Sequence, residues 1–90
     1  MYELTFQEAI ERCAKGEGFI RGELFKSGVY VKRQGETLVA VDGLNSNRVI
    51  GNLYISTAIM TQKYKLFNNV AVEELTDGAG RLHNLYSKAV

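Results

Sequence analysis

The chain has no proline and no tryptophan, and it has a single cysteine and a single histidine among its 90 residues. One cysteine excludes a disulfide within the chain. Cys13 and His83 are also too few to supply a tetrahedral zinc site of cysteine and histidine ligands within one chain. The lack of proline removes the usual signals of linkers and of proline-rich recognition motifs. The sequence therefore excludes small domains held together by disulfides or by a single-chain zinc site.

Long apolar runs are missing as well. No run approaches the roughly 18 apolar residues that a membrane-spanning helix needs. The first residues, MYELTFQEAIER, are acidic and amphipathic and lack the apolar core of a signal peptide. We therefore expect a protein of the cytoplasm.

The chain does have a basic middle. Residues 21–65 carry seven lysines and arginines against three acidic residues, whereas residues 1–20 and 66–90 are each net acidic. A basic surface attracts phosphate-bearing ligands. The same pattern is typical of a solvated sheet face whose lysines discourage strand pairing between molecules. The charge distribution leaves both interpretations open.

A helix is predicted over residues 5–15. The segment from Thr5 to Glu8 has the form of a capping box, in which each of these two side chains bonds the other residue's backbone N–H. Gly16 suits the position just after a helix, where a left-handed residue ends it. The apolar residues recur three and four positions apart, as on one face of an amphipathic helix: Phe6, Ala9, Ile10, Cys13 and Ala14.

Strands are predicted after this helix. Two runs rich in β-branched residues flank Gln34-Gly35, which predicts a hairpin with a two-residue loop. Residues 44–48 are predicted to form a loop. The β-prone runs lie at 19–21, 29–33, 36–42 and 63–67.

The segment 49–62 is ambiguous. Val49-Ile50 and residues 53–55 favour strands, whereas Ser56 to Met60 favours the start of a short helix. Residues 70–72 are interpreted as a return strand.

The order of these elements predicts an α+β fold, with an N-terminal amphipathic helix packed on a small antiparallel sheet and a further short helix before the last main strand. Residues 1–76 are expected to form a single domain. Residues 77–90 are expected to be a C-terminal tail, interpreted either as a short helix at a subunit interface or as a frayed end. A domain of this size buries only about 60–65% of the surface that its unfolded chain exposes, so a lone monomer would be marginally stable.

Catalytic patterns are weak. Cys13 falls on the apolar face of the predicted helix, where a buried core thiol is expected rather than a nucleophile. The glycines Gly16, Gly18 and Gly22 follow a helix, whereas a dinucleotide-binding loop opens one. Glu73 and Glu74 are adjacent, so in a strand they would face opposite sides. We therefore expect no catalytic residues, no metal site and no cofactor, and a protein that is not an enzyme.

Nucleic-acid binding was the first alternative. Basic residues alternate with aromatic ones at 30–33 and 63–67, a pattern that holds single strands on a basic sheet. The sequence pI is about 7.8, which is low for a nucleic-acid-binding module. We therefore expect nucleic acid to be an unlikely partner.

Short motifs in this order resemble the Thoeris anti-defence family of the second type. The shared features are a Thr-Phe-x-x-Ala-Ile helix, a Lys-Gly-x-x-Phe-Ile-Arg strand, a Gly-Val-Tyr-Val strand and a Ser-Thr segment before a last strand with an aromatic residue at its start. In this sequence they are Thr5, Phe6, Ala9 and Ile10; Lys15, Gly16, Phe19, Ile20 and Arg21; Gly28 to Val31; Ser56 and Thr57; and Tyr64. Where family members often carry Gly-Trp and Asp-Trp, this chain has Gly22-Glu23 and Lys63-Tyr64.

The resemblance implies a phage protein of the infected host cell's cytoplasm. Such proteins act as sponges: they bind glycocyclic ADP-ribose, the signal of Thoeris immunity, and hold it without degrading it. Some members also hold cyclic dinucleotides. The resemblance further implies an α+β fold assembled as a homotetramer.

Glycocyclic ADP-ribose presents a pyrophosphate, an adenine face and ribose hydroxyls. Holding it requires cations, a stacking ring and amide or hydroxyl partners. The candidate ligand-binding residues are Arg21, Lys26 and Arg48 for phosphate, Phe25 and Tyr64 for stacking, and Asn45 and Asn47 for hydroxyls or a base edge. Each also has a structural interpretation: a core or interface ring, a surface ion pair or a turn. Two other functions stay open, a small single-stranded nucleic-acid-binding domain and a phage inhibitor that binds a host protein through a sheet edge.

Overall fold

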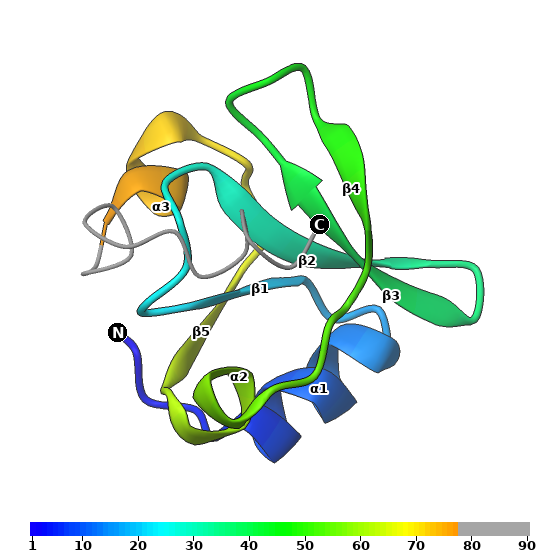
Figure 1. Cartoon of the computed structure of the whole chain (residues 1–90), viewed down its shortest axis with the longest axis vertical. Helices are drawn as coiled ribbons and strands as arrows, with labels where there is room; N and C mark the ends of the chain where they lie inside the picture. The colour runs from blue at the N-terminus through cyan, green and yellow to red at the C-terminus, as the bar shows by residue number, and fades with distance from the viewer. Residues whose placement is uncertain (78–90) are drawn as a thin grey trace.

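A computed structural model gives the structure of residues 1–77, and the description below concerns these residues. They form one five-stranded antiparallel sheet, in the order β4-β3-β2-β1-β5, with short helices packed against it (Figure 1). The architecture is the α+β fold expected from the sequence. The elements are α1 (Phe6–Ala14), β1 (Phe19–Gly22), β2 (Val29–Gln34), β3 (Thr37–Asp42), β4 (Arg48–Asn52), α2 (Thr57–Thr61), β5 (Tyr64–Phe67) and α3 (Val72–Thr76).

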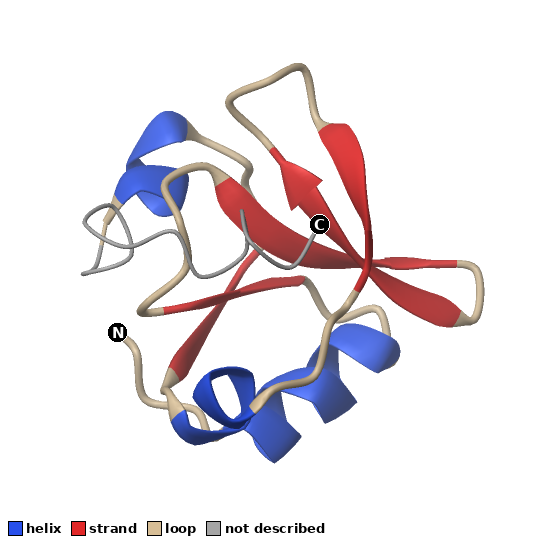
Figure 2. Cartoon of the chain, in the orientation of Figure 1, coloured by secondary structure: helices blue, strands red, loops and turns tan. Residues whose placement is uncertain are grey.

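The two faces of the sheet carry separate core clusters, because successive strand residues point to opposite sides. Val29 and Val31 of β2 pack in one cluster with Cys13 of α1 and with residues of α2. Tyr30, between them, joins the other cluster with Leu75 of α3. Figure 2 accordingly shows α1 and α2 together at the bottom of the view and α3 apart from them at the upper left. The sheet is therefore covered by α1 and α2 on one face and by α3 on the other.

Helix α1 confirms the predicted helix, with its flanking residues acting as caps. The Glu8 backbone N–H donates to Thr5 Oγ1 at 3.2 Å, and the Thr5 N–H donates to Glu8 Oε1 at 2.9 Å. Gly16 adopts a φ of 79°, the left-handed conformation expected just after the helix. Ala9 and Cys13, from the predicted apolar face, are fully buried. Local sequence rules are thus sufficient for this element.

The β2–β3 hairpin forms as predicted, but its loop lies one residue further along the chain. Gln34 pairs with Thr37, so the two loop residues are Gly35 and Glu36 rather than Gln34 and Gly35. Gly35 has a φ of 63°, and the next residue does not share a positive φ. Glycine at the first loop position is the signature of a type II′ turn. The residue with the left-handed conformation is therefore the first of the two loop residues.

The ambiguous segment resolves into β4, an extended stretch and α2. Residues 53–55, for which a strand was one interpretation, form no strand, and the Leu53 N–H donates to the Leu38 carbonyl at 3.0 Å. Ser56 caps α2 through a bond from the Ile59 N–H at 3.3 Å, which confirms the short helix predicted before the last strand.

The return strand predicted at 70–72 is wrong, because α3 begins at Val72. Glu73 and Glu74 occupy the first turn of this helix, where carboxylates interact favourably with the positive end of the helix dipole. Leu75 is 1% exposed, so burial of one apolar side chain on the sheet outweighs the β propensity of the valines. The predicted C-terminal tail lies outside the described residues, except for Asp77.

Candidate functional site

The structure divides the seven predicted ligand-binding residues between the interior and the surface. Arg21, Phe25 and Tyr64 have at most 1% of their surface exposed. Lys26 is half-buried, and the remaining three, Asn45, Asn47 and Arg48, are exposed. The seven residues therefore do not form one surface within the chain.

Arg21 supports the loop between β1 and β2. Its Nη1 donates to the carbonyls of Lys26 and Val29 at 2.9 and 2.8 Å. Its Nη2 donates to the carbonyls of Phe25 and Asp77 at 3.3 and 2.8 Å, and its Nε lies 3.4 Å from Asp77 Oδ1. Every nitrogen of the guanidinium is thus bonded within the chain, so the expected role in phosphate binding does not fit this geometry.

Phe25 and Tyr64 pack against each other in the core next to α1 and α2. Their ring centroids are 5.9 Å apart and the rings are nearly perpendicular, at 86°. The Tyr64 hydroxyl donates to the Ile59 carbonyl. Buried rings in an edge-to-face pair stabilise a core. Neither ring offers an open face for stacking on a ligand.

The four candidates outside the interior lie in the loop between β1 and β2 and at the connection from β3 to β4. Asn47 Oδ1 accepts a hydrogen bond from the Tyr30 hydroxyl at 3.1 Å, and Asn47 has a φ of 53°. The two loops are tied together by the Gly43 N–H, which donates to the Gly28 carbonyl at 2.8 Å. Lys26, Asn45, Asn47 and Arg48 therefore lie at one end of the sheet, which we call the loop end.

Two hollows lie at the opposite end of the sheet, and both are lined by Arg33. The first, of about 260 Å³, is formed by the end of α1 and the hairpin tip, and the second, of about 310 Å³, by the start of β1 and the end of β5. We call them the hairpin hollow and the strand hollow. The hairpin hollow is lined by Ala14, Arg33, Gly35, Glu36 and Leu38, and the strand hollow by Gly16, Gly18, Phe19, Arg33 and Asn68.

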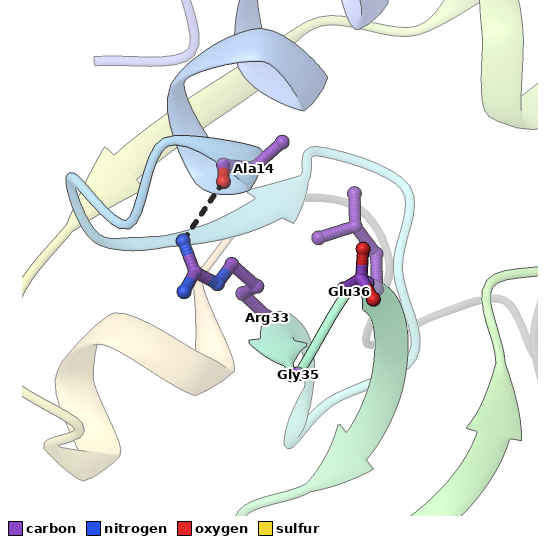
Figure 3. A pocket seen from close by; sticks show the side chains of 5 residues that line it. Ala14, Arg33, Gly35 and Glu36 are labelled. Carbon is purple, nitrogen blue, oxygen red and sulfur yellow. Dashed lines mark hydrogen bonds between the residues drawn. The ribbon is translucent and has the colours of Figure 1, made fainter.

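Arg33 is held between these hollows by the end of α1. Its Nη1 donates to the Ala14 carbonyl at 3.2 Å (Figure 3). The carbonyl end of a helix carries a partial negative charge, so the guanidinium is favourably placed there. In the same view Arg33 and Glu36 flank Gly35 at the hairpin tip. The result is an exposed cation with a fixed position.

Arg33 and its neighbours were not predicted as site residues. The residues that line the two hollows come from the segments 14–19 and 33–38 and from residue 68. These parts of the chain meet only in the folded protein. One signal was present in the sequence. Val29, Val31 and Arg33 share one face of β2, so a charge follows two buried apolar residues on the side that carries α1.

Cys13 is buried, and its Sγ lies 3.8 Å from the Val31 carbonyl. Burial raises the pKa of the Cys13 thiol to about 11, although the nearby charge of Arg33 acts in the opposite direction. The thiol is therefore protonated at neutral pH and is a poor nucleophile.

The aromatic and basic residues at 63–67 do not form a surface for single strands. Tyr64 is 1% exposed and Lys65 is 2% exposed. Lys65 Nζ donates to Glu74 Oε1 and to Asp77 Oδ2, each at 2.7 Å. Its charge is thus neutralised by α3 and the residue that follows it.

Membrane-spanning helices and metal-binding clusters are absent from residues 1–77. None of the described helices is long and apolar enough to cross a membrane. Within the same residues, no group of three or more His, Cys, Asp or Glu side chains is placed to hold a metal ion.

Comparisons of the chain with protein-family models, with curated proteins and with solved structures each gave no match.

Proposed function

We propose that this chain binds a phosphate-bearing nucleotide ligand and holds it without changing it chemically. Following the resemblance of its sequence, the proposed ligand is glycocyclic ADP-ribose, or a cyclic dinucleotide, and the proposed role is to block Thoeris-type immunity in the cytoplasm of an infected host. The observation that carries the proposal is the position of Arg33, an exposed guanidinium that lines two hollows at once.

The guanidinium is well suited to a phosphate. Arg33 makes one hydrogen bond to the described part of the chain, through Nη1. Its remaining N–H donors are open to a ligand, and two of them can bind one phosphate in parallel. Because Nη1 is fixed on the Ala14 carbonyl, less side-chain freedom is lost when the ligand binds.

The strand hollow places an amide beside the guanidinium, and Phe19 is also among its lining residues. Phe19 is half-buried, and its ring contacts Tyr30 edge-on and Phe67 at a tilt, at centroid distances of 5.4 and 5.7 Å, on the face that carries α3. Asn68 provides an exposed amide, which can both donate to and accept from a base edge or a hydroxyl. Amide and guanidinium therefore line one hollow, whereas the Phe19 ring lies on the face of the sheet opposite to Arg33.

Holding a ligand intact requires no nucleophile, and the protonated state of Cys13 agrees with that requirement. The resemblance further supports assembly into a homotetramer. Both hollows are shallow, so contacts from a second copy would increase the buried surface of a ligand.

Paired substitutions distinguish the hollows from the loop end. We expect Arg33→Ala to weaken calorimetric binding of glycocyclic ADP-ribose by about tenfold or more, because a charged hydrogen bond contributes about 1.5–3 kcal/mol. Arg48→Ala removes the same charge at the loop end and should leave affinity within about twofold. Lys32→Ala, on the other face of β2, controls for loss of net charge. The reverse result, with Arg48→Ala alone weakening binding, would move the site to the loop end.

A further inference from the structure

The two hollows beside Arg33 differ in chemistry. We propose that Glu36 is a specificity-determining residue that accepts hydrogen bonds from the vicinal hydroxyls of the ligand's sugar, while the phosphate lies on the side of Arg33 that faces Asn68. The ligand class is then a phosphorylated ribose. This inference rests on the proposed function, because it assigns the two parts of a ligand to the two hollows.

The hairpin hollow is rich in acceptors. Glu36 is exposed at the hairpin tip, and its carboxylate makes no hydrogen bond or ion pair with another residue of the described chain. The Ala14 carbonyl, which accepts from Arg33, belongs to the negative end of α1. An ionised carboxylate accepts hydrogen bonds and cannot donate them. Hydroxyl groups suit this hollow, whereas a second phosphate would be repelled.

The strand hollow has the opposite character. Arg33 contributes donors and a positive charge, Asn68 contributes an amide, and among residues 1–77 no acidic side chain lines this hollow. A phosphate is therefore favoured on this side of the guanidinium. Arg33 is the shared wall, so one ligand can place its phosphate on one side and its sugar hydroxyls on the other.

The hairpin hollow also has an apolar wall. Leu38 is half-buried and Ala14 lies opposite the hairpin tip. A ribose ring presents C–H groups on the face away from its hydroxyls, and these can pack on such a wall. A carboxylate that binds a ribose 2′-hydroxyl is a recurrent means of recognising nucleotides. The arrangement at Glu36 provides the same chemistry from a hairpin tip.

Backbone geometry fixes the position of the Glu36 backbone at the hairpin tip. Glu36 follows Gly35, whose φ of 63° sets the tight turn, and Gln34 and Thr37 are paired on either side. The Thr37 hydroxyl also donates to the Gln34 carbonyl at 3.0 Å, closing the turn. Glu36 is therefore presented by a two-residue loop with little freedom, as selective recognition requires.

The test compares ribose 5-phosphate with 2-deoxyribose 5-phosphate, two probes that differ by one hydroxyl. Binding is followed by NMR titration of the whole chain at millimolar probe. We expect the wild type to bind the ribose compound about fivefold more tightly and to show shift changes around Gly35, Glu36 and Arg33. Glu36→Gln should reduce that preference to less than about twofold and leave the 2-deoxy compound's affinity nearly unchanged. Glu73→Gln makes the same charge change at an exposed position of α3 and should keep the full preference for the ribose compound.

Equal affinity of the wild type for the two probes, or no binding of ribose 5-phosphate, would overturn this inference. So would a preference that survives in Glu36→Gln. None of these results bears on the titration of glycocyclic ADP-ribose with Arg33→Ala, which tests the proposed function by itself. A spectrum of Glu36→Gln that overlays the wild type away from the hairpin shows that the fold is retained.

Discussion

Arg21 and Arg33 lie on neighbouring strands of the sheet and have opposite surroundings. Arg21 is fully buried, and its nitrogens bond carbonyls from residues 25–29 and from Asp77. Arg33 is exposed and, within residues 1–77, makes a single hydrogen bond, to the Ala14 carbonyl at the end of α1. The sequence could not separate these roles, because the burial of Arg21 depends on a partner 56 positions away.

Asp77 joins three parts of the chain. Its Oδ1 accepts from the Tyr2 hydroxyl at 2.6 Å, its Oδ2 accepts from Lys65 Nζ at 2.7 Å, and Arg21 Nε lies 3.4 Å from Oδ1. Lys65 also bonds Glu74 at 2.7 Å. Two buried cations are thus balanced by two carboxylates, Glu74 in the first turn of α3 and Asp77 just after the helix.

Asp77→Asn should destabilise the protein by about 2 kcal/mol at neutral pH, because it removes the carboxylate that the buried side chains of Arg21 and Lys65 share. The pKa of Asp77 is lowered: burial would raise it, but hydrogen bonds from Lys65 and Tyr2 outweigh that effect. A lowered pKa means that the stabilisation is complete above the ordinary value of 3.8 and is lost as the pH falls through the lower, folded-state pKa. Urea denaturation at neutral pH and at about pH 3 measures both effects.

The difference in stability between wild type and Asp77→Asn should therefore shrink in acid. Glu73→Gln, an exposed change of the same kind in α3, should cost less than about 0.5 kcal/mol. A difference that stays constant from neutral pH down to full protonation of carboxylates would contradict the role assigned to Asp77.

Helix α1 was predictable because all of its signals are local. Thr5, Glu8 and Gly16 fix its ends, and the apolar spacing fixes the face that it buries. The hairpin turn was misplaced by one residue, since the prediction put glycine second in the loop whereas a type II′ turn has it first. Residues 70–72 were mistaken for a strand, since Val70 and Val72 favour one and the local pattern does not show the burial of Leu75.

Thr5→Ala should destabilise the protein by about 1 kcal/mol, because it removes the hydroxyl that accepts from the Glu8 N–H. Gln7→Ala, on the exposed face of the same helix, should change stability by less than about 0.5 kcal/mol. Thermal or urea denaturation of the three proteins provides the comparison. Equal stability of Thr5→Ala and wild type would show that the capping box contributes nothing to the fold.

The candidate site was the least predictable part of the structure. The hollows combine the end of α1, the hairpin tip, the start of β1 and the residue after β5. No local pattern indicates that these four segments meet. The sequence predicted a ligand site from the residue types in the basic middle of the chain. The structure places three of those residues, Arg21, Phe25 and Tyr64, in the interior.

At the scale of the whole molecule, the sheet edges bear on the alternative of a host-protein inhibitor. Edge strand β4 has a bulge opposite Ala40 and Val41, and a bulge twists an edge away from further pairing. Edge strand β5 is partly covered, because Leu4 and Tyr64 exchange two backbone hydrogen bonds of 3.0 and 2.8 Å. Neither edge is a long, flat template, which disfavours binding by strand addition.

Exposed apolar side chains are better candidates than the sheet edges for contacts between copies of this chain. Four of them, each 43–54% exposed, follow one another along β4, the extended stretch and α2: Val49, Tyr54, Ile55 and Met60. The proposed homotetramer predicts a light-scattering mass of four chains. A charge introduced by Ile55→Lys should shift the mass to smaller assemblies, whereas Glu11→Lys on the exposed face of α1 should not. A wild-type mass of one chain would contradict the assembly.

The most direct test of the proposed function is calorimetric titration of the wild-type chain with glycocyclic ADP-ribose, followed by heating of the complex and chromatography of the released ligand. We predict saturable, tight binding and release of the ligand unchanged. A ligand recovered in altered form would show an enzyme rather than a sponge. No binding of glycocyclic ADP-ribose or of cyclic dinucleotides would contradict the proposed function and leave the likeness to the anti-defence family without functional meaning.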